Sequence, residues 1–195
     1  MDAEPPRVTL VLGGARSGKS SFAQQLAERS RPPVLFVATA TGDDAEMAAR
    51  IEAHRAARPE TWRTVEVPLD VGQAIWRSGR GARTVLLDCL SLLVSNCLVG
   101  LPEDKWDAGV GQEATARVER EVAALMEATR AIGRDLIVVS NEVGMGIVPE
   151  YPLGRVYRDL LGLANQQIAQ IANAVYLVVA GIPVDVKALH GRVGY

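Results

Sequence analysis

The chain has 195 residues, and 48% of them are hydrophobic, which is enough for one domain over residues 1–195 with a substantial core. The formal net charge is −2, so we expect no general attraction to nucleic acid or to acidic membranes. No apolar run approaches the length of a bilayer span, and residues 1–6 are acidic and proline-containing, unlike a signal peptide. These features predict a cytoplasmic protein. Cys89 and Cys97 lack metal-ligand spacing, and we interpret them as small packing residues.

The most informative motif follows the first predicted strand, residues 8–12, and precedes a predicted helix over 21–30. It has the pattern G-x-x-x-x-G-K-S, in which backbone N–H groups surround phosphate oxygens at the start of a helix. Lys19 is expected to reach the β- and γ-phosphates, and the Ser20 hydroxyl to bind Mg²⁺. A glycine turn with a chance lysine is the alternative. The predicted phosphate loop consists of Gly13, Gly14, Ala15, Arg16, Ser17, Gly18, Lys19 and Ser20.

Strand and helix patterns alternate along the rest of the chain. The predicted strands are nearly continuous apolar runs, which favours a parallel sheet covered on both faces. We therefore predict an α/β P-loop sandwich of three layers with a mostly parallel central sheet. The further predicted strands are 34–38, 64–67, 84–88, 136–140 and 175–179, with a short edge strand at 184–189. The predicted helices are 43–57, 71–77, 91–98, 108–132 and 153–173, with a loop at 100–104.

Asp88 ends an apolar strand, as the Mg²⁺-directed acid of a P-loop protein usually does. Aspartate also caps helices, and that interpretation stays open. No N-K-x-D run for guanine recognition occurs in the sequence, so a signalling GTPase of the usual kind is not expected.

The predicted helix 43–57 carries a second group of functional side chains. Arg50, His54 and Arg58 are four residues apart and share one helix face if the helix continues to Arg58. Two flanking guanidiniums would lower the pKa of His54 and keep its imidazole neutral, so that it could act as a nucleophile. The alternative is a solvated arginine-rich helix whose histidine packs beside Met47 and Ile51.

Together these motifs resemble the bifunctional adenosylcobinamide kinase and adenosylcobinamide-phosphate guanylyltransferase family of cobalamin biosynthesis. The most specific shared run is Asn141-Glu142-Val143-Gly144-Met145-Gly146-Ile147-Val148-Pro149. Some relatives carry two adjacent histidines in the second helix, where this chain has Ala53 and His54. The resemblance also rests on the phosphate loop, residues 44–59, Trp62-Arg63-Thr64, and Arg155, Arg158, Asp159, Gly162, Asn165 and Gln166.

The resemblance implies two reactions at one nucleotide site. The first phosphorylates the hydroxyl on the aminopropanol arm of adenosylcobinamide, with ATP or GTP as donor and Mg²⁺ as cofactor. The second transfers GMP from GTP to that phosphate through a histidine–GMP intermediate, and His54 matches the nucleophile. The resemblance also suggests a homo-oligomer, with a trimer as the best guess.

Further nucleotide contacts follow from the resemblance residue by residue. Glu66 could accept hydrogen bonds from the guanine N1 and N2 donors, and Asp88 could contact either nucleotide or metal. Asn141 and Glu142 end a strand near the expected site, although turn formation and helix capping would explain them equally. The implied contacts beyond the phosphate loop are Ala38, Thr39, Ala40, Arg55, Ala56, Ala57, Arg58, Glu66 and Asp88.

Two other functions remain open at this point. A P-loop kinase with a single activity on another small metabolite would keep Lys19, Ser20 and Asp88 but would not use His54. A nucleotide-dependent binding module would need a partner surface, and the sequence shows no marked apolar patch or charged tail.

Overall fold

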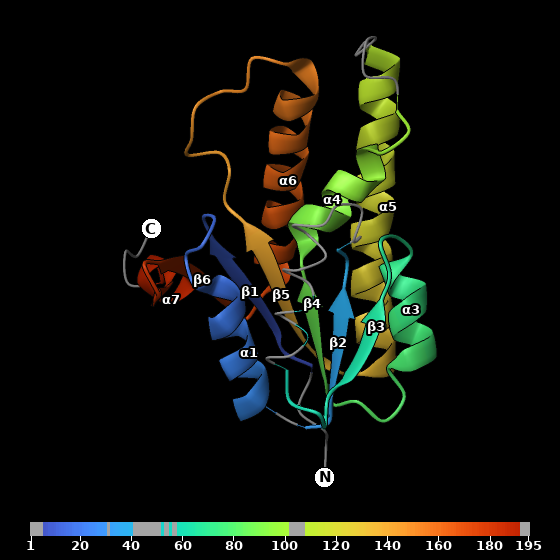
Figure 1. The fold of residues 1–195 in the computed structure, drawn as a ribbon, viewed down its shortest axis with the longest axis vertical. Helices are drawn as coiled ribbons and strands as arrows, with labels where there is room; N and C mark the ends of the chain where they lie inside the picture. Colours follow the sequence, from blue (N-terminus) through green and yellow to red (C-terminus); the bar gives the residue numbers. More distant parts are fainter. Residues whose placement is uncertain are drawn as a thin grey trace.

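A computed structural model of the chain describes residues 6–30, 32–40, 52, 55, 58–101 and 108–191. The strands form one seven-stranded sheet in the order β3-β2-β4-β5-β1-β6-β7 (Figure 1). Neighbouring strands are parallel, except that β7 runs antiparallel to β6. The strands are β1 Val8–Gly13, β2 Val34–Ala38, β3 Arg63–Glu66, β4 Thr84–Asp88, β5 Asp135–Asn141, β6 Ala174–Val179 and β7 Ile182–Asp185.

Helices cover both faces of this sheet, which confirms the predicted fold class. On one face, α1 buries Ala23 and Ala27 against Val11, Phe36 and Val139. The larger core lies on the other face, where α3, α4, α5 and α6 pack (Figure 1). The helices are α1 Lys19–Arg29, α3 Val71–Ser78, α4 Leu90–Leu98, α5 Ala108–Ile132, α6 Pro152–Ile171 and α7 Val186–His190.

Most predicted elements are present, with small shifts at their ends. Helix α1 begins two residues before its predicted start, and α6 ends at Ile171. Asn173, predicted to be helical, instead accepts a hydrogen bond from the Val8 N–H through its side chain (2.8 Å). Within the predicted helix 43–57, only Glu52 and Arg55 are described, and both are helical. Residues 102–104 of the predicted loop lie outside the described ranges.

The predicted edge strand over 184–189 is correct for Val184 and Asp185 and wrong from Val186 onward. The strand β7 covers Ile182–Asp185, and the chain then forms the short helix α7. The reason is local, because the Asp185 carboxylate accepts a hydrogen bond from the Ala188 N–H (2.9 Å) and caps that helix. Lys187 then reaches across to carbonyl oxygens at the end of α6.

The strand registers bring the predicted site residues to one edge of the sheet. Gly13 pairs with Asn141, and Ala38 pairs with both Glu66 and Asp88. These residues end five neighbouring parallel strands and so lie along the carboxyl edge, where open α/β sheets bind ligands. None of the helices that the structure describes is long and apolar enough to cross a bilayer.

Candidate active site

The phosphate loop has the predicted strand–loop–helix context. Strand β1 ends at Gly13, and α1 begins at Lys19 after Gly18, which has a left-handed φ of 92°. A Cβ on Gly13 would lie 2.4 Å from the Ser17 hydroxyl oxygen, so only glycine fits the tight turn there. Lys19 Nζ donates a hydrogen bond to the Gly14 carbonyl (3.1 Å), which holds the lysine over the loop.

The turn between β6 and β7 supports the loop from outside. The Gly181 N–H donates to the Ser17 carbonyl (2.8 Å). The Ser17 hydroxyl is buried and has no hydrogen-bond partner among the described residues. A buried hydroxyl without a hydrogen-bond partner is unfavourable, so the Ser17 hydroxyl is available to donate to, or accept from, a ligand bound at this loop.

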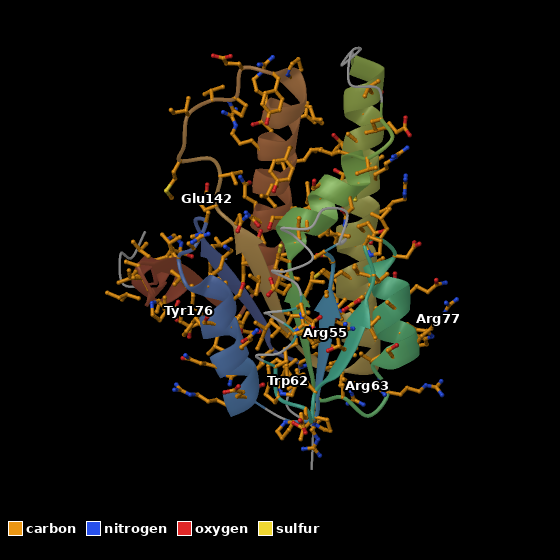
Figure 2. The ribbon with its side chains drawn as sticks, viewed as in Figure 1. Arg55, Trp62, Arg63, Arg77, Glu142 and Tyr176 are labelled. Atoms are coloured by element: carbon orange, nitrogen blue, oxygen red, sulfur yellow. The ribbon has the colours of Figure 1, made fainter. Side chains whose placement is uncertain are left out.

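Acidic and basic side chains gather along the neighbouring strand ends. Arg55 Nη2 forms an ion pair with Glu66 Oε1 at 3.1 Å (Figure 2 labels Arg55). The Arg58 guanidinium lies 3.7 Å from the centroid of the Phe36 ring, an arrangement typical of cation–π contact. Burial lowers the pKa of Arg58, while the negative charges of Asp88 and Glu66 act in the opposite direction. Arg55, Arg58, Glu66 and Asp88 are therefore electrostatic neighbours.

Arg58 also has unused hydrogen-bonding capacity. Its Nε and Nη1 atoms are buried and have no hydrogen-bond partner among the described residues. The Phe36 ring beneath it stacks with Trp62 at a centroid distance of 6.3 Å. This aromatic support holds a guanidinium, the group that best matches phosphate oxygens, beside the sheet edge.

Thr39 has a structural role that the sequence did not reveal. Its hydroxyl donates to the Cys89 carbonyl (2.7 Å) and accepts from the Cys89 N–H (2.9 Å). Its own N–H donates to the Asp88 carbonyl, and its carbonyl accepts from Asn96. Thr39 thus fastens the end of β2 to the end of β4, and a nucleotide contact there would compete with these bonds.

Cys89 directly follows Asp88 at the end of β4. Burial raises the pKa of its thiol, the Asp88 charge raises it further, and a hydrogen bond with Ser91 and the Lys19 charge lower it. The thiol is therefore protonated at neutral pH and is a poor nucleophile.

Strand β5 ends at Asn141, whose role the sequence left open between a site residue and a residue that forms a turn or caps a helix. This strand lies between β1 and β4, and Asn141 at its end has a buried Oδ1 without a hydrogen-bond partner among the described residues. Behind it, Asn165 of α6 donates to the Asn141 carbonyl (3.1 Å). The run N-E-V-G-M-G-I-V-P marked Asn141 as a candidate. Its position between the phosphate loop and Asp88 depends on the strand order, which the sequence alone does not reveal.

Several predicted site residues cannot be located. His54, Ala56 and Ala57 lie outside the described residues, and so do Arg50, Met47 and Ile51.

Ala38 and Ala40 flank Thr39 at the end of β2. The Ala38 carbonyl accepts from the Val67 N–H (2.9 Å), which extends the β2–β3 pairing beyond Glu66.

A cavity of about 520 Å³ lies at the opposite, amino edge of the sheet. Its lining includes Arg7, Arg29 and Tyr176 and none of the predicted site residues. We assign the active site to the carboxyl edge because the phosphate loop and the acidic strand ends are located there.

Comparison with known proteins identifies the family of the chain. Residues 9–186 match the family model described as cobinamide kinase / cobinamide phosphate guanyltransferase. The chain belongs to this family. It is similar to the bifunctional adenosylcobalamin biosynthesis protein CobU of Escherichia coli K12, with 44% identity covering 91% of this chain and 98% of that protein.

Two further relatives are also named bifunctional adenosylcobalamin biosynthesis proteins. CobU of Salmonella typhimurium LT2 is 40% identical, with 91% of this chain and 98% of that protein covered. CobP of Pseudomonas aeruginosa PAO1 is 40% identical, with 91% of this chain and 96% of that protein covered. The chain is therefore an enzyme of the cobinamide kinase / cobinamide phosphate guanyltransferase family, as the phosphate loop and the second helix suggested.

The oxygen donors of this family member suit magnesium. Among the residues described, no group of three or more His, Cys, Asp or Glu could hold a metal ion alone. Mg²⁺ rarely needs such a cage, because it usually binds one or two protein oxygens together with substrate phosphates and water. Ser20, in the first turn of α1, and Asp88, at the end of β4, are donors of this kind.

Proposed function

We propose that the protein phosphorylates adenosylcobinamide, with ATP or GTP as donor, and then transfers GMP from GTP to the resulting phosphate. The observation that carries this proposal is the complete phosphate loop at the carboxyl edge, the edge at which β4 ends in Asp88, in a chain of the cobinamide kinase family. The products would be adenosylcobinamide-GDP and pyrophosphate.

In the first reaction, the corrinoid hydroxyl oxygen attacks the γ-phosphorus of the donor. A new P–O bond forms, the bond to the β-phosphate oxygen breaks, and the nucleoside diphosphate leaves. We propose that the backbone N–H groups of residues 13–20 and the Lys19 ammonium hold the triphosphate and stabilise the charge that develops on it. Mg²⁺ bound by Ser20 and Asp88 would supply further charge neutralisation.

In the second reaction, we propose that the neutral His54 imidazole attacks the α-phosphorus of GTP. An N–P bond forms and pyrophosphate leaves, and the phosphate of the corrinoid then displaces the histidine to form a P–O–P linkage. A covalent intermediate divides one difficult displacement into two easier ones. The Arg58 guanidinium, with two buried N–H groups lacking partners in the described structure, suits the charged oxygens of the triphosphate.

Nucleotide recognition completes the proposal. We infer that Glu66 accepts hydrogen bonds from the guanine edge and that Arg55, its ion-pair partner, orients it. Ala38, Ala40, Ala56 and Ala57 would line the same nucleotide, and Thr39 would support that wall through its hydrogen bonds to Cys89. Cys89 and Cys97 are both free thiols, which fits the reducing cytoplasm as the proposed location.

Two labels on GTP test the whole scheme. With γ-labelled GTP, wild-type protein should transfer label to adenosylcobinamide, and with α-labelled GTP, label should appear in adenosylcobinamide-GDP. Label from the γ-position alone would identify a kinase with a single activity. Hydrolysis without transfer of either label would favour a nucleotide-dependent binding module instead.

A further inference from the structure

Four large apolar side chains protrude from the connection between β5 and α6. Met145 is 80% exposed, Ile147 97%, Val148 57% and Tyr151 63%. We call these four residues the apolar loop patch. Exposed apolar side chains that are grouped in this way mark binding surfaces, because leaving them in water is unfavourable.

The connection that carries the patch has a defined shape. Glu142 Oε1 accepts a hydrogen bond from the Gly144 N–H (2.6 Å), which closes a tight turn at its start. At its end, Arg155 Nη1 donates to the carbonyls of Pro149 (3.0 Å) and Glu150 (2.5 Å). A Cβ on Gly154 would lie 2.8 Å from both Pro149 and the Tyr151 ring, so the connection packs tightly on α6.

The same connection begins at the phosphate loop. The Glu142 N–H donates to the Gly13 carbonyl (3.2 Å), and Gly13 is the first residue of the phosphate loop. Figure 1 shows the connection extending from the tip of β5 past the carboxyl edge of the sheet and beside α6, and Figure 2 labels Glu142 at its base. A substrate whose reacting oxygen lies at the phosphates would extend along this connection.

Cobinamide has the chemistry that such a surface would bind. Its hydroxyl is at the end of a flexible arm, whereas its corrin ring is wide, carries methyl groups and cannot enter a phosphate loop. The ring must therefore rest on protein outside the nucleotide site, and its methyl groups gain from apolar contacts there. We propose that the apolar loop patch is the surface that binds the corrin ring, an inference that rests on the proposed function.

A second copy of the chain is the competing occupant. A stable protein interface takes roughly 20 to 30 residues on each side, and the patch supplies four side chains on one loop. The connection also leaves the sheet beside Gly13, as a continuation of the β1–β5 pairing, so a molecule that rests on it lies near the phosphate loop.

A double variant tests this assignment. Met145→Ser/Ile147→Ser should raise the KM for adenosylcobinamide tenfold or more, because it removes apolar contacts made in both ground and transition states. The KM for GTP should stay within twofold of wild type. Ile171→Ser is the matched control, since Ile171 is exposed at the far end of α6, and it should change neither KM. Met145→Leu/Ile147→Val keeps the surface apolar and should behave like wild type.

A second measurement uses wild-type protein and avoids any effect of substitution on folding. Cobinamide without nucleotide should slow the oxidation of Met145 by hydrogen peroxide, followed by mass spectrometry, and GTP alone should not. An unchanged KM in the serine variant, or equal oxidation with and without cobinamide, would overturn the inference. So would a fall in oligomeric mass of the serine variant by light scattering, which would assign the patch to a subunit contact.

These failures differ from failure of the proposed function. If the wild-type protein phosphorylates cobinamide and retains GMP while the patch variants keep a normal KM, only the corrinoid surface is wrong. If the wild-type protein performs neither reaction, the proposed function itself is wrong.

Discussion

Lys19 is the residue on which both proposed reactions depend. Its ammonium donates a hydrogen bond to the Gly14 carbonyl and so lies over the phosphate loop. We predict that Lys19→Ala abolishes the kinase step and strongly weakens guanylylation, because one positioned electrostatic group contributes roughly 3 kcal/mol or more in a transition state. Steady-state assays of both products would measure this.

Arg29→Ala serves as the control for Lys19→Ala, because it removes an exposed positive charge from the last turn of the same helix. It should leave both activities near wild type. Near-normal turnover in Lys19→Ala would contradict the assignment of the phosphate loop. Loss of only one activity would mean that the two reactions use different phosphate sites.

Glu66 tests guanine recognition. Its carboxylate can accept from both N1 and N2 of guanine, whereas glutamine offers one acceptor. We predict that Glu66→Gln raises the KM for GTP about tenfold, equivalent to roughly 1.4 kcal/mol, and has less effect on ITP, which lacks the 2-amino group. Because Arg55 pairs with Glu66, Arg55→Ala is the companion variant, and it should affect both nucleotides alike. Equal losses for GTP and ITP in Glu66→Gln would argue against a guanine contact.

The structure explains which residues the sequence could identify. The phosphate loop was recognisable because its glycines and lysine are fixed by local geometry. Thr39 was assigned to the nucleotide, but its hydrogen bonds to Cys89 depend on β2 lying beside β4. The stacking of Arg58 on Phe36 also joins segments far apart in sequence, and no local pattern predicts it.

At the scale of elements, the error at 184–189 has a clear physical cause. The sequence predicted a short edge strand there, but a capping carboxylate at Asp185 favours a helical turn directly after it. Apolar periodicity predicts long helices and strands well. The five-residue helix α7 depends instead on the Asp185 cap and on the contact of Lys187 with α6.

That tertiary contact gives a stability prediction. Lys187 Nζ donates to the carbonyls of Ala169 (2.9 Å) and Ala172 near the end of α6, where unpaired carbonyls and the helix dipole favour a cation. Lys187→Met should lower the free energy of unfolding by about 1 kcal/mol. The expected fall in Tm is about 2–4 °C for a chain of this length.

Differential scanning calorimetry would measure the Lys187→Met effect. Arg77→Met is the matched control, because Arg77 is exposed on α3 and Figure 2 shows it directed away from the molecule. An equal Tm change in both variants would mean that loss of a positive charge, rather than the contact with α6, is responsible.

At the scale of the whole molecule, the fold class followed from the continuous apolar strands. The strand order did not, because parallel pairing joins segments far apart in the chain and leaves no local signal. This order puts β5 between the phosphate loop and Asp88, and so places Asn141 in the site.

Assembly remains a prediction from the family resemblance. Light scattering of the purified protein should give about three times the 20.9 kDa mass of one chain if the protein is a trimer. A mass equal to one chain at micromolar concentration would contradict the prediction of a homo-oligomer.

The central claim is that one chain carries both a phosphoryl-transfer site and a histidine that accepts GMP. Protein incubated with α-labelled GTP and Mg²⁺ should retain an acid-labile label. His54→Ala should retain none and form no adenosylcobinamide-GDP, while its kinase rate should fall by no more than about tenfold, or 1.4 kcal/mol. His190→Ala, which changes the other histidine of the chain, should label normally. Labelled GMP on His54→Ala would place the nucleophile elsewhere, and loss of both activities in a folded variant would contradict the division of labour proposed here.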